Sequence, residues 1–203
     1  MKLYFSPGAC SLASHIALHA SGLPFSVEKV NLRVQPHQTE SGADFSAINP
    51  KGYVPALQLD NGELLTEGAA ILQYIADQAA GKALAPANGT LARYRLQEWL
   101  NYIATEVHKN FSPLFYPGSD EAKQQAWDKL TARFALLERT LAQSPYLLGA
   151  QFSVADAYLF TCLSWSRYVQ RSLADFPALI DYQKRVAALP AAQAALKAEG
   201  LAD

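Results

Sequence analysis

The first eighty residues alternate between short apolar runs and segments with helical spacing. Residues 2–6 form a mostly apolar run that predicts a strand, and the next segment places Leu12, Ile16 and Ala17 on one helical face. The sequence SGLP ends that helix, and residues 26–32 alternate between polar and apolar side chains as a strand does. Strand, helix and strand make a βαβ unit, whose two strands we expect to be parallel neighbours.

Two further strands are predicted within YVPALQLDNGELLTEG, on either side of Asp60-Asn61-Gly62. An Asn-Gly pair between two such runs is a strong signal for a hairpin turn. A helix from about Gly68 to Gln78 follows. The order βαβ and then ββα predicts a small sheet flanked by helices.

The pattern changes at residue 81, where GKALAPANG has the small residues, Gly and Pro of a linker. Beyond it we find no strand pattern and expect a helical bundle, with helices over residues 90–113, 120–143, 154–171 and 176–189 and a short one at the end. Ser153 stands three residues before Asp156, which is close to a capping box. The chain therefore predicts an α/β domain of residues 1–80, a linker of residues 81–89 and an all-helical domain of residues 90–203.

Charge and hydropathy exclude several classes of partner. The 203 residues carry 17 basic and 18 acidic side chains, so the electrostatic footprint of a nucleic-acid-binding protein is missing. No apolar run approaches the roughly 20 residues of a membrane span, and the N-terminal stretch reaches Pro and Gly too early for a signal peptide. We therefore expect a cytoplasmic protein with reduced thiols and with neither a nucleic-acid nor a membrane partner. Cys10 and Cys162 fit no zinc spacing, so we expect no metal site and no disulfide.

Cys10 lies where the turn SPGA meets the first predicted helix. The N–H groups at a helix N-terminus favour the thiolate, which is the nucleophilic form of cysteine. The alternative is a small buried hydrophobic residue, which describes Cys162 well, and on position alone both interpretations of Cys10 stay open. We expect His19 and His37 at the surface, and His15, five positions along the helix, to face away from the sulfur.

Two other places could hold the backbone or the charges of a ligand. Pro55 restricts Val54 to an extended conformation, in which it could pair with a peptide-like ligand; the alternative is a proline at a sheet edge. Thr66-Glu67-Gly68 opens a helix whose amides could hold a carboxylate, while Glu67 could accept an ammonium group. The alternative there is three ordinary residues of a first helical turn.

The predicted helix over residues 90–113 carries an unusual polar stripe. Gln97, Asn101, Thr105 and His108 cluster opposite its apolar face. The ordinary explanation is a solvated face, but Asn, Thr and His replace the Glu and Lys that are typical there.

These stretches together resemble the cytosolic glutathione transferases, and most closely the bacterial beta class. The resemblance covers essentially the whole chain and rests on five motifs in the family's order: KLYFSPGACSLASHIAL, NPKGYVPAL, LTEGAAILQYIAD, RYRLQEWLNYIATEVHKNFSPLF and FSVADAYLF. It implies a thioredoxin-like domain followed by a helical domain, a homodimer, and glutathione as co-substrate.

The resemblance also assigns roles to residues of the first domain. Cys10 matches the cysteine that contacts glutathione and can form a mixed disulfide with it. Val54, ahead of a cis Pro55, matches the residue that pairs with the cysteinyl backbone of glutathione. Glu67 and Gly68 match the pair that holds its γ-glutamyl end.

In the helical domain, Asn101, Thr105 and His108 match polar residues that line the glutathione site, with His108 close to the sulfur and some contacts coming from a partner chain. The family's lysine after the second strand, which contacts the glycine carboxylate, is missing. Gln35 aligns with it, in a loop that is longer by about two residues. Arg33 or His37 could substitute for it.

The function that the resemblance implies is conjugation of the glutathione thiolate to small, hydrophobic, aromatic or halogenated electrophiles, a detoxification reaction. Cys10 and His108 could stabilise the glutathione sulfur, or Cys10 could itself attack and act as a disulfide reductase. Tyr4 and Ser11 correspond to the key hydroxyls of other transferase classes, but the GACS sequence favours the sulfur.

The expected electrophile pocket consists of aromatic residues that could equally belong to the core: Phe111, Phe115, Tyr116 and Trp165. The alternative function is a non-catalytic protein on the same fold that binds ligands or docks on a partner.

Overall fold

The computed structural model describes residues 1–202, and the chain divides into two compact units. The first unit combines Met1–Leu84 with Pro190–Asp203, and the second is Ala85–Leu189.

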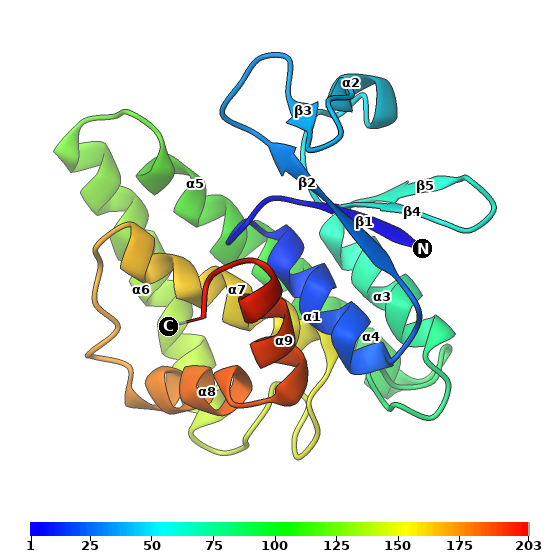
Figure 1. Ribbon diagram of the computed structural model, residues 1–203. Coiled ribbons are helices and arrows are strands. Elements are labelled where there is room, and N and C mark those ends of the chain that lie inside the picture. The colour runs from blue at the N-terminus through cyan, green and yellow to red at the C-terminus, as the bar shows by residue number, and fades with distance from the viewer. Residues whose placement is uncertain (203) are drawn as a thin grey trace. The chain divides into compact units, whose positions relative to one another are not determined.

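The first unit is built on a five-stranded mixed sheet with the strand order β3-β2-β1-β4-β5 (Figure 1). Its strands are β1 (Lys2–Phe5), β2 (Ser26–Asn31), β3 (Gln38–Thr39), β4 (Ala56–Gln58) and β5 (Leu64–Thr66). β1 runs parallel to β2, with Leu3 opposite Val27, and antiparallel to β4, with Tyr4 opposite Ala56. The predicted βαβ-ββα order is confirmed. The short β3 was not predicted.

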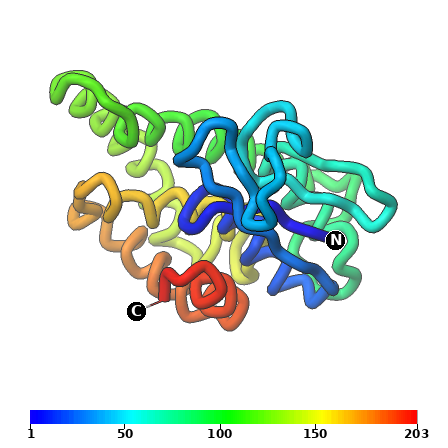
Figure 2. The backbone as a smooth tube through the Cα atoms, turned by 45° about the horizontal axis from the view of Figure 1, so that its top comes forward, coloured from blue at the N-terminus to red at the C-terminus, as the bar shows by residue number. Residues whose placement is uncertain are grey.

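The predicted hairpin joins β4 and β5 and is the cyan loop in Figure 2. Leu59 N–H donates to the Glu63 carbonyl at 2.8 Å, and Gly62 N–H donates to the Leu59 carbonyl at 3.0 Å. Gly62 has φ 89°, in the left-handed region that glycine enters without a steric penalty. The Asn61-Gly62 signal therefore marks the turn correctly.

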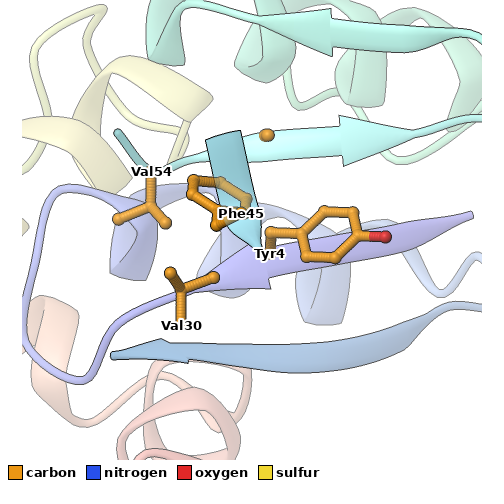
Figure 3. Close-up of a cluster of buried hydrophobic side chains, with 5 residues drawn as sticks. Tyr4, Val30, Phe45 and Val54 are labelled. Atoms are coloured by element: carbon orange, nitrogen blue, oxygen red, sulfur yellow. The ribbon is translucent and has the colours of Figure 1, made fainter. Parts of the chain in front are cut away.

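Alternation along β1 sends its side chains to two different cores. Tyr4 packs on Phe45 of the short helix α2 (Phe45–Ile48), together with Val30, Val54 and Ala56 (Figure 3). Each of these five side chains is at most 3% exposed. They join β1, β2, the start of β4 and α2 into one apolar cluster.

Phe5, on the other face of β1, lies against α1 (Ser11–Ser21), with its ring centroid 5.5 Å from that of His15. α1 packs between α3 (Gly68–Gln78) and α9 (Pro190–Ala198). Gly22, with φ 70°, ends α1 in the left-handed conformation typical of a helix C-cap.

A buried polar contact ties the C-terminal segment to α1. Glu199 accepts a hydrogen bond from the Gly8 N–H at 2.8 Å and contacts His15 Nδ1 at 2.9 Å. The Glu199 and His15 side chains are each at most 1% exposed. The expectation that His19 lies on the surface is wrong. It is half-buried, with its ring stacked 5.0 Å from His15 and against Phe25, because α1 is covered along this side.

The grouping of α9 differs from the predicted arrangement of residues 90–203 as one helical domain. By its contacts α9 belongs with the first unit, since it packs along α1 and buries Ala192 and Ala195. Hydrophobic spacing shows that a segment is helical, but it does not show which core that segment joins. Residue 203 lies outside the described residues.

The second unit is helical throughout its regular elements, as predicted. It contains α4 (Leu91–Tyr102), η1 (Ile103–His108), α5 (Lys109–Phe115), α6 (Asp120–Leu141), α7 (Val154–Tyr168) and α8 (Pro177–Ala187). The single helix expected over residues 90–113 is continuous to Phe115 but has a π-helical segment, η1, in its middle. Within residues 1–202 no helix combines the length and apolar character needed to cross a membrane.

Capping hydrogen bonds mark where these helices begin. Ser119 Oγ accepts the Ala122 N–H at 3.2 Å at the start of α6. At the start of α7, Asp156 accepts the Ser153 N–H at 2.9 Å and its hydroxyl at 2.7 Å, which is the carboxylate half of the predicted capping box. The N-terminus of α8 is capped from a distance, because Glu138 accepts the N–H groups of residues 178 and 179.

The buried contact at Glu199 generates a stability prediction. Glu199→Ala should lower the free energy of unfolding by about 3 kcal/mol, because it removes the carboxylate that contacts the buried His15 ring and accepts the Gly8 N–H. Urea denaturation measures the change.

Two variants frame the Glu199→Ala result. Glu199→Gln, which keeps an acceptor for Gly8, should lose less stability than Glu199→Ala. Glu98→Ala breaks an exposed ion pair with Arg95, which water screens, and should lower the free energy of unfolding much less than Glu199→Ala does. Equal losses for Glu98→Ala and Glu199→Ala would contradict the structural role of the buried pair.

Candidate active site

Cys10 occupies the N-cap position of α1, at the end of a compact turn. Ser11 Oγ accepts the Ser6 N–H at 3.1 Å and donates to the Ser6 carbonyl at 3.3 Å, which closes the turn. Gly8, inside the turn, has φ 71° and is held by Glu199. The turn therefore fixes where the thiol leaves the backbone, as the SPGAC sequence predicts.

The Cys10 thiol reaches the segment that leads into β4. Its Sγ donates to the Val54 carbonyl at 3.1 Å. The Val54-Pro55 peptide bond is cis, as the resemblance implied. Gly68, the first residue of α3, lies against Pro55, since a Cβ at Gly68 would sit 3.8 Å from Pro55 Cγ. The first unit therefore brings Cys10, Val54, Pro55 and Gly68 together.

Glu67 precedes Gly68 and carries the charge at this end of the site. It has φ 70°, which is uncommon for a residue with a side chain. Its Oε1 accepts hydrogen bonds from Lys51 Nζ at 2.6 Å and from the Tyr53 hydroxyl at 2.7 Å. These bonds raise the pKa of the Lys51 ammonium and that of the Tyr53 phenol. Neither Lys51 nor Tyr53 was predicted as a site residue, although both lie in the NPKGYVPAL motif.

A cleft of about 790 Å³ adjoins the Cys10 turn. Ser6 and Pro7 line it, together with Lys29 of β2 and Arg33 in the loop that follows β2. Gln35, the residue that aligns with the missing lysine, is exposed in the loop beyond.

Gln35 and His37 are engaged with each other and with their own loop. Gln35 Nε2 lies 3.5 Å from His37 Nε2, and His37 Nδ1 lies 2.8 Å from the Val34 carbonyl oxygen. Of Arg33, Gln35 and His37, only Arg33 lines the cleft, and its positive charge could pair with a ligand carboxylate.

The two hydroxyls of the other transferase classes have structural partners here. Tyr4 is 3% exposed, and its hydroxyl donates to Gln58 Oε1 at 3.3 Å. Ser11 is buried in the turn it closes. This geometry agrees with the choice of the Cys10 sulfur from the GACS sequence.

His108, in the second unit, is held by aromatic neighbours on α7. Its Nδ1 lies 2.7 Å from the Tyr158 hydroxyl, and its ring centroid is 4.8 Å from that of Trp165. Burial, with the positive charge of Lys109 nearby, lowers the pKa of His108 to about 4. The imidazole is therefore neutral at pH 7 and offers one N–H donor and one acceptor.

Two other members of the polar stripe, Asn101 and Thr105, are more open to solvent than His108. Asn101 and Thr105 are exposed, and Thr105 Oγ1 donates to the Asn101 carbonyl at 3.0 Å. The π-helical segment, which contains Thr105 and His108, changes the rotation per residue between them. The ideal helical spacing assumed for the stripe therefore does not hold after Tyr102.

The four aromatic residues expected to form an electrophile pocket differ in burial. Phe111 is fully buried and Trp165 is 4% exposed, whereas Phe115 is 46% and Tyr116 is 67% exposed. Phe111, Phe115 and Trp165 contact one another, with ring centroids 5.6 to 6.5 Å apart. Cys162 is 0% exposed, as expected for a buried cysteine.

Comparison with known proteins places the chain in a family. Residues 8–78 match the model of the glutathione S-transferase N-terminal domain, and residues 120–185 match that of the C-terminal domain. The chain belongs to the glutathione S-transferase family. Glutathione S-transferase GstA of Escherichia coli O157:H7 is 45% identical to it, over 99% of this chain and 100% of that protein.

Solved structures of bacterial transferases extend this comparison. The ternary complex of BphK, a bacterial transferase, has a TM-score of 0.96 at 55% identity, covering 99% of this chain and 100% of that one. The beta-class transferase of Sphingomonas chungbukensis has a TM-score of 0.94 at 50% identity and is covered in full, as is this chain. The expected fold class and the expectation of a transferase enzyme are confirmed. Among the described residues no group of three His, Cys, Asp or Glu side chains could hold a metal ion.

The low pKa of His108 generates a prediction for the pH dependence of stability. An unfolded histidine titrates near pH 6.5, so between about pH 6.5 and 4 the unfolded chain binds a proton that native His108 does not. Acidification therefore favours unfolding, by about 1.4 kcal/mol at pH 5.5 relative to neutral pH. His108→Gln should lack this part of the pH dependence, as measured by urea denaturation at pH 7.5 and 5.5.

The control for His108→Gln is His37→Gln, which makes the same replacement in a surface loop. If His108→Gln retained the full wild-type loss of stability at pH 5.5, the ring would not be neutral in the native protein.

Proposed function

We propose that this transferase binds glutathione along the first unit and catalyses its transfer to small electrophiles through a site centred on Cys10. The observation that carries the proposal is the contact between the Cys10 thiol and the Val54 carbonyl, 3.1 Å apart. It brings a potential nucleophile to the backbone segment that would pair with the cysteinyl residue of glutathione. A solved sphingomonad transferase, 52% identical, is a complex with glutathione.

The ends of glutathione carry charges that this unit can complement. Glu67 would accept the γ-glutamyl ammonium group, and the first amides of α3, beginning at Gly68, would face the α-carboxylate. Arg33, in the cleft beside the Cys10 turn, would hold the glycine carboxylate in place of the missing lysine, whereas Gln35 would contribute only a neutral contact.

The family resemblance supports further parts of the proposal. Asn101, Thr105 and His108 would complete the glutathione site, with some contacts from a second copy of the chain in a homodimer. The aromatic residues at 111, 115, 116 and 165 would contact an aromatic or halogenated electrophile. The cellular role would be detoxification in the cytoplasm.

Two chemical routes are open at Cys10. In conjugation, the glutathione thiolate attacks an electrophilic carbon and expels a leaving group such as halide, while Cys10 donates a hydrogen bond to its sulfur. The family resemblance implies neutral His108 as a second donor. In disulfide reduction, the Cys10 thiolate attacks the glutathionyl sulfur of a mixed disulfide and releases the other thiolate. A second glutathione thiolate then attacks the Cys10-bound glutathione, which regenerates Cys10 and releases oxidised glutathione.

Cys10→Ala separates the two routes. Disulfide reduction should fall at least about 100-fold, because the variant has no thiol to form the mixed disulfide, while aryl halide conjugation should fall less than about tenfold, a range set by the loss of one hydrogen bond to the sulfur. Steady-state rates with a mixed disulfide of glutathione and a small thiol measure the reductase activity, and rates with an aryl halide measure conjugation.

Peptide mapping provides the control for Cys10→Ala. Wild-type protein treated with oxidised glutathione should carry one adduct, on Cys10, because Cys162 is fully buried. Equal losses in both assays, or an adduct confined to Cys162, would refute the proposed division of roles.

Arg33→Met tests the assignment of the glycine end. The KM for glutathione should rise about fivefold with little change in kcat, because the lost contact is present equally in the ground state and the transition state. Gln35→Met is the matched control and should change KM less than twofold. A larger effect for Gln35→Met than for Arg33→Met would reverse the assignment.

A further inference from the structure

Lys51 has no role in the site described so far, yet it contacts the residue that would bind the γ-glutamyl ammonium group. Its Nζ lies 2.6 Å from Glu67 Oε1 and 3.0 Å from Thr66 Oγ1. An ammonium group of the protein therefore occupies the position on Glu67 that the ammonium group of glutathione would need. Tyr53 donates to the same oxygen at 2.7 Å.

The loop that carries Lys51 is held by hydrogen bonds from the buried Asn49, which is 1% exposed. Asn49 Nδ2 donates to the Tyr53 carbonyl at 2.7 Å, and its Oδ1 accepts the Lys51 N–H at 3.1 Å. The Gly52 N–H donates to the Asn49 carbonyl at 2.9 Å, with Gly52 at φ 73°. The backbone on both sides of Lys51 is thereby held, while its long side chain can turn about its own bonds.

The Lys51–Glu67 pair is exposed enough to exchange partners. The Lys51 and Glu67 side chains are 47% and 58% exposed, and a pair of this kind contributes little net stability because water screens it. A ligand that offers both an ammonium group and a carboxylate can satisfy both side chains at once. A ligand that offers only the ammonium group would leave Lys51 without a new partner.

We propose that Lys51 is a specificity-determining residue that exchanges partners when glutathione binds. Glu67 then pairs with the ligand ammonium group, and the Lys51 ammonium group turns to pair with the ligand α-carboxylate. No proton is transferred and no covalent bond changes, and two ion pairs replace one. The site thereby selects a γ-glutamyl end that carries both charges. This inference rests on the proposed binding of glutathione.

Isothermal titration calorimetry on the full chain, with a phosphine reductant present, tests the exchange. The two ligands are glutathione and 4-aminobutyryl-cysteinyl-glycine, which keeps the ammonium group and lacks the α-carboxylate. The variants are Lys51→Met, Lys51→Arg as the charge-conserving replacement, and Lys2→Met as the matched control. Lys2 forms a comparable ion pair, with Glu28 at 3.0 Å, on β1 and away from the loop.

In Lys51→Met, the affinity for glutathione should fall about fivefold, as expected for loss of one partly exposed ion pair. The affinity for the decarboxylated analogue should stay the same or rise, because the competitor for Glu67 is gone. The preference for glutathione over the analogue should therefore shrink at least about fivefold. Lys51→Arg should restore most of that preference, and Lys2→Met should leave it unchanged within twofold.

Equal changes in affinity for the two ligands, or no change for either, would overturn the inference while leaving the glutathione proposal intact. A wild-type protein that binds glutathione no better than the analogue would also overturn it. A wild-type protein that binds no glutathione would refute the glutathione proposal itself, and this inference with it.

Discussion

The geometry of the first unit depends on the pairing of β1 on both of its edges. Because β1 runs parallel to β2 and antiparallel to β4, the C-terminal end of β1 and the start of β4 lie side by side at one end of the strands. The chain leaves β1 through the turn that ends at Cys10, and it enters β4 through Val54 and Pro55. A thiol and a backbone carbonyl separated by 44 residues in sequence are thereby brought to 3.1 Å. The hairpin brings the C-terminal end of β5 back to the start of β4, so that Glu67 and Gly68, at the start of α3, lie at this same end of the strands.

Local patterns predicted most of this arrangement, because each depends on neighbours in sequence. The alternation in β2, the Asn61-Gly62 turn and the helical face of α1 are properties of short windows. Helix α2 and strand β3 have four and two residues and are too short for periodicity to reveal them. They form because the loop after β2 returns and places Phe45 over Tyr4, a contact between distant parts of the chain.

The contacts that were not predicted have the same explanation, because they join distant parts of the chain. Nothing near His15 in sequence indicates that a glutamate 184 residues away lies against it, and an isolated histidine on a helix has no preferred partner. Lys51 and Tyr53 belong to a motif that was recognised for Val54 and Pro55, but their contact with Glu67 depends on how the Asn49 loop is folded. The polar stripe that includes His108 was predicted with ideal helical spacing, which a π-helical segment alters without an obvious signal in sequence.

The contact between Cys10 and Val54 also bears on what the thiol does. The sulfur can donate to the Val54 carbonyl only while it carries its proton, and a thiolate in the same position would face a carbonyl oxygen instead. The N-terminus of α1 favours the thiolate, whereas the hydrogen bond to the Val54 carbonyl favours the protonated thiol, so the two effects oppose each other in the free protein. A peptide ligand that extends along Val54 would offer its own N–H to that carbonyl and release the thiol from it. Binding of the glutathione backbone and availability of the Cys10 sulfur would then be one event, because both compete for the same carbonyl oxygen.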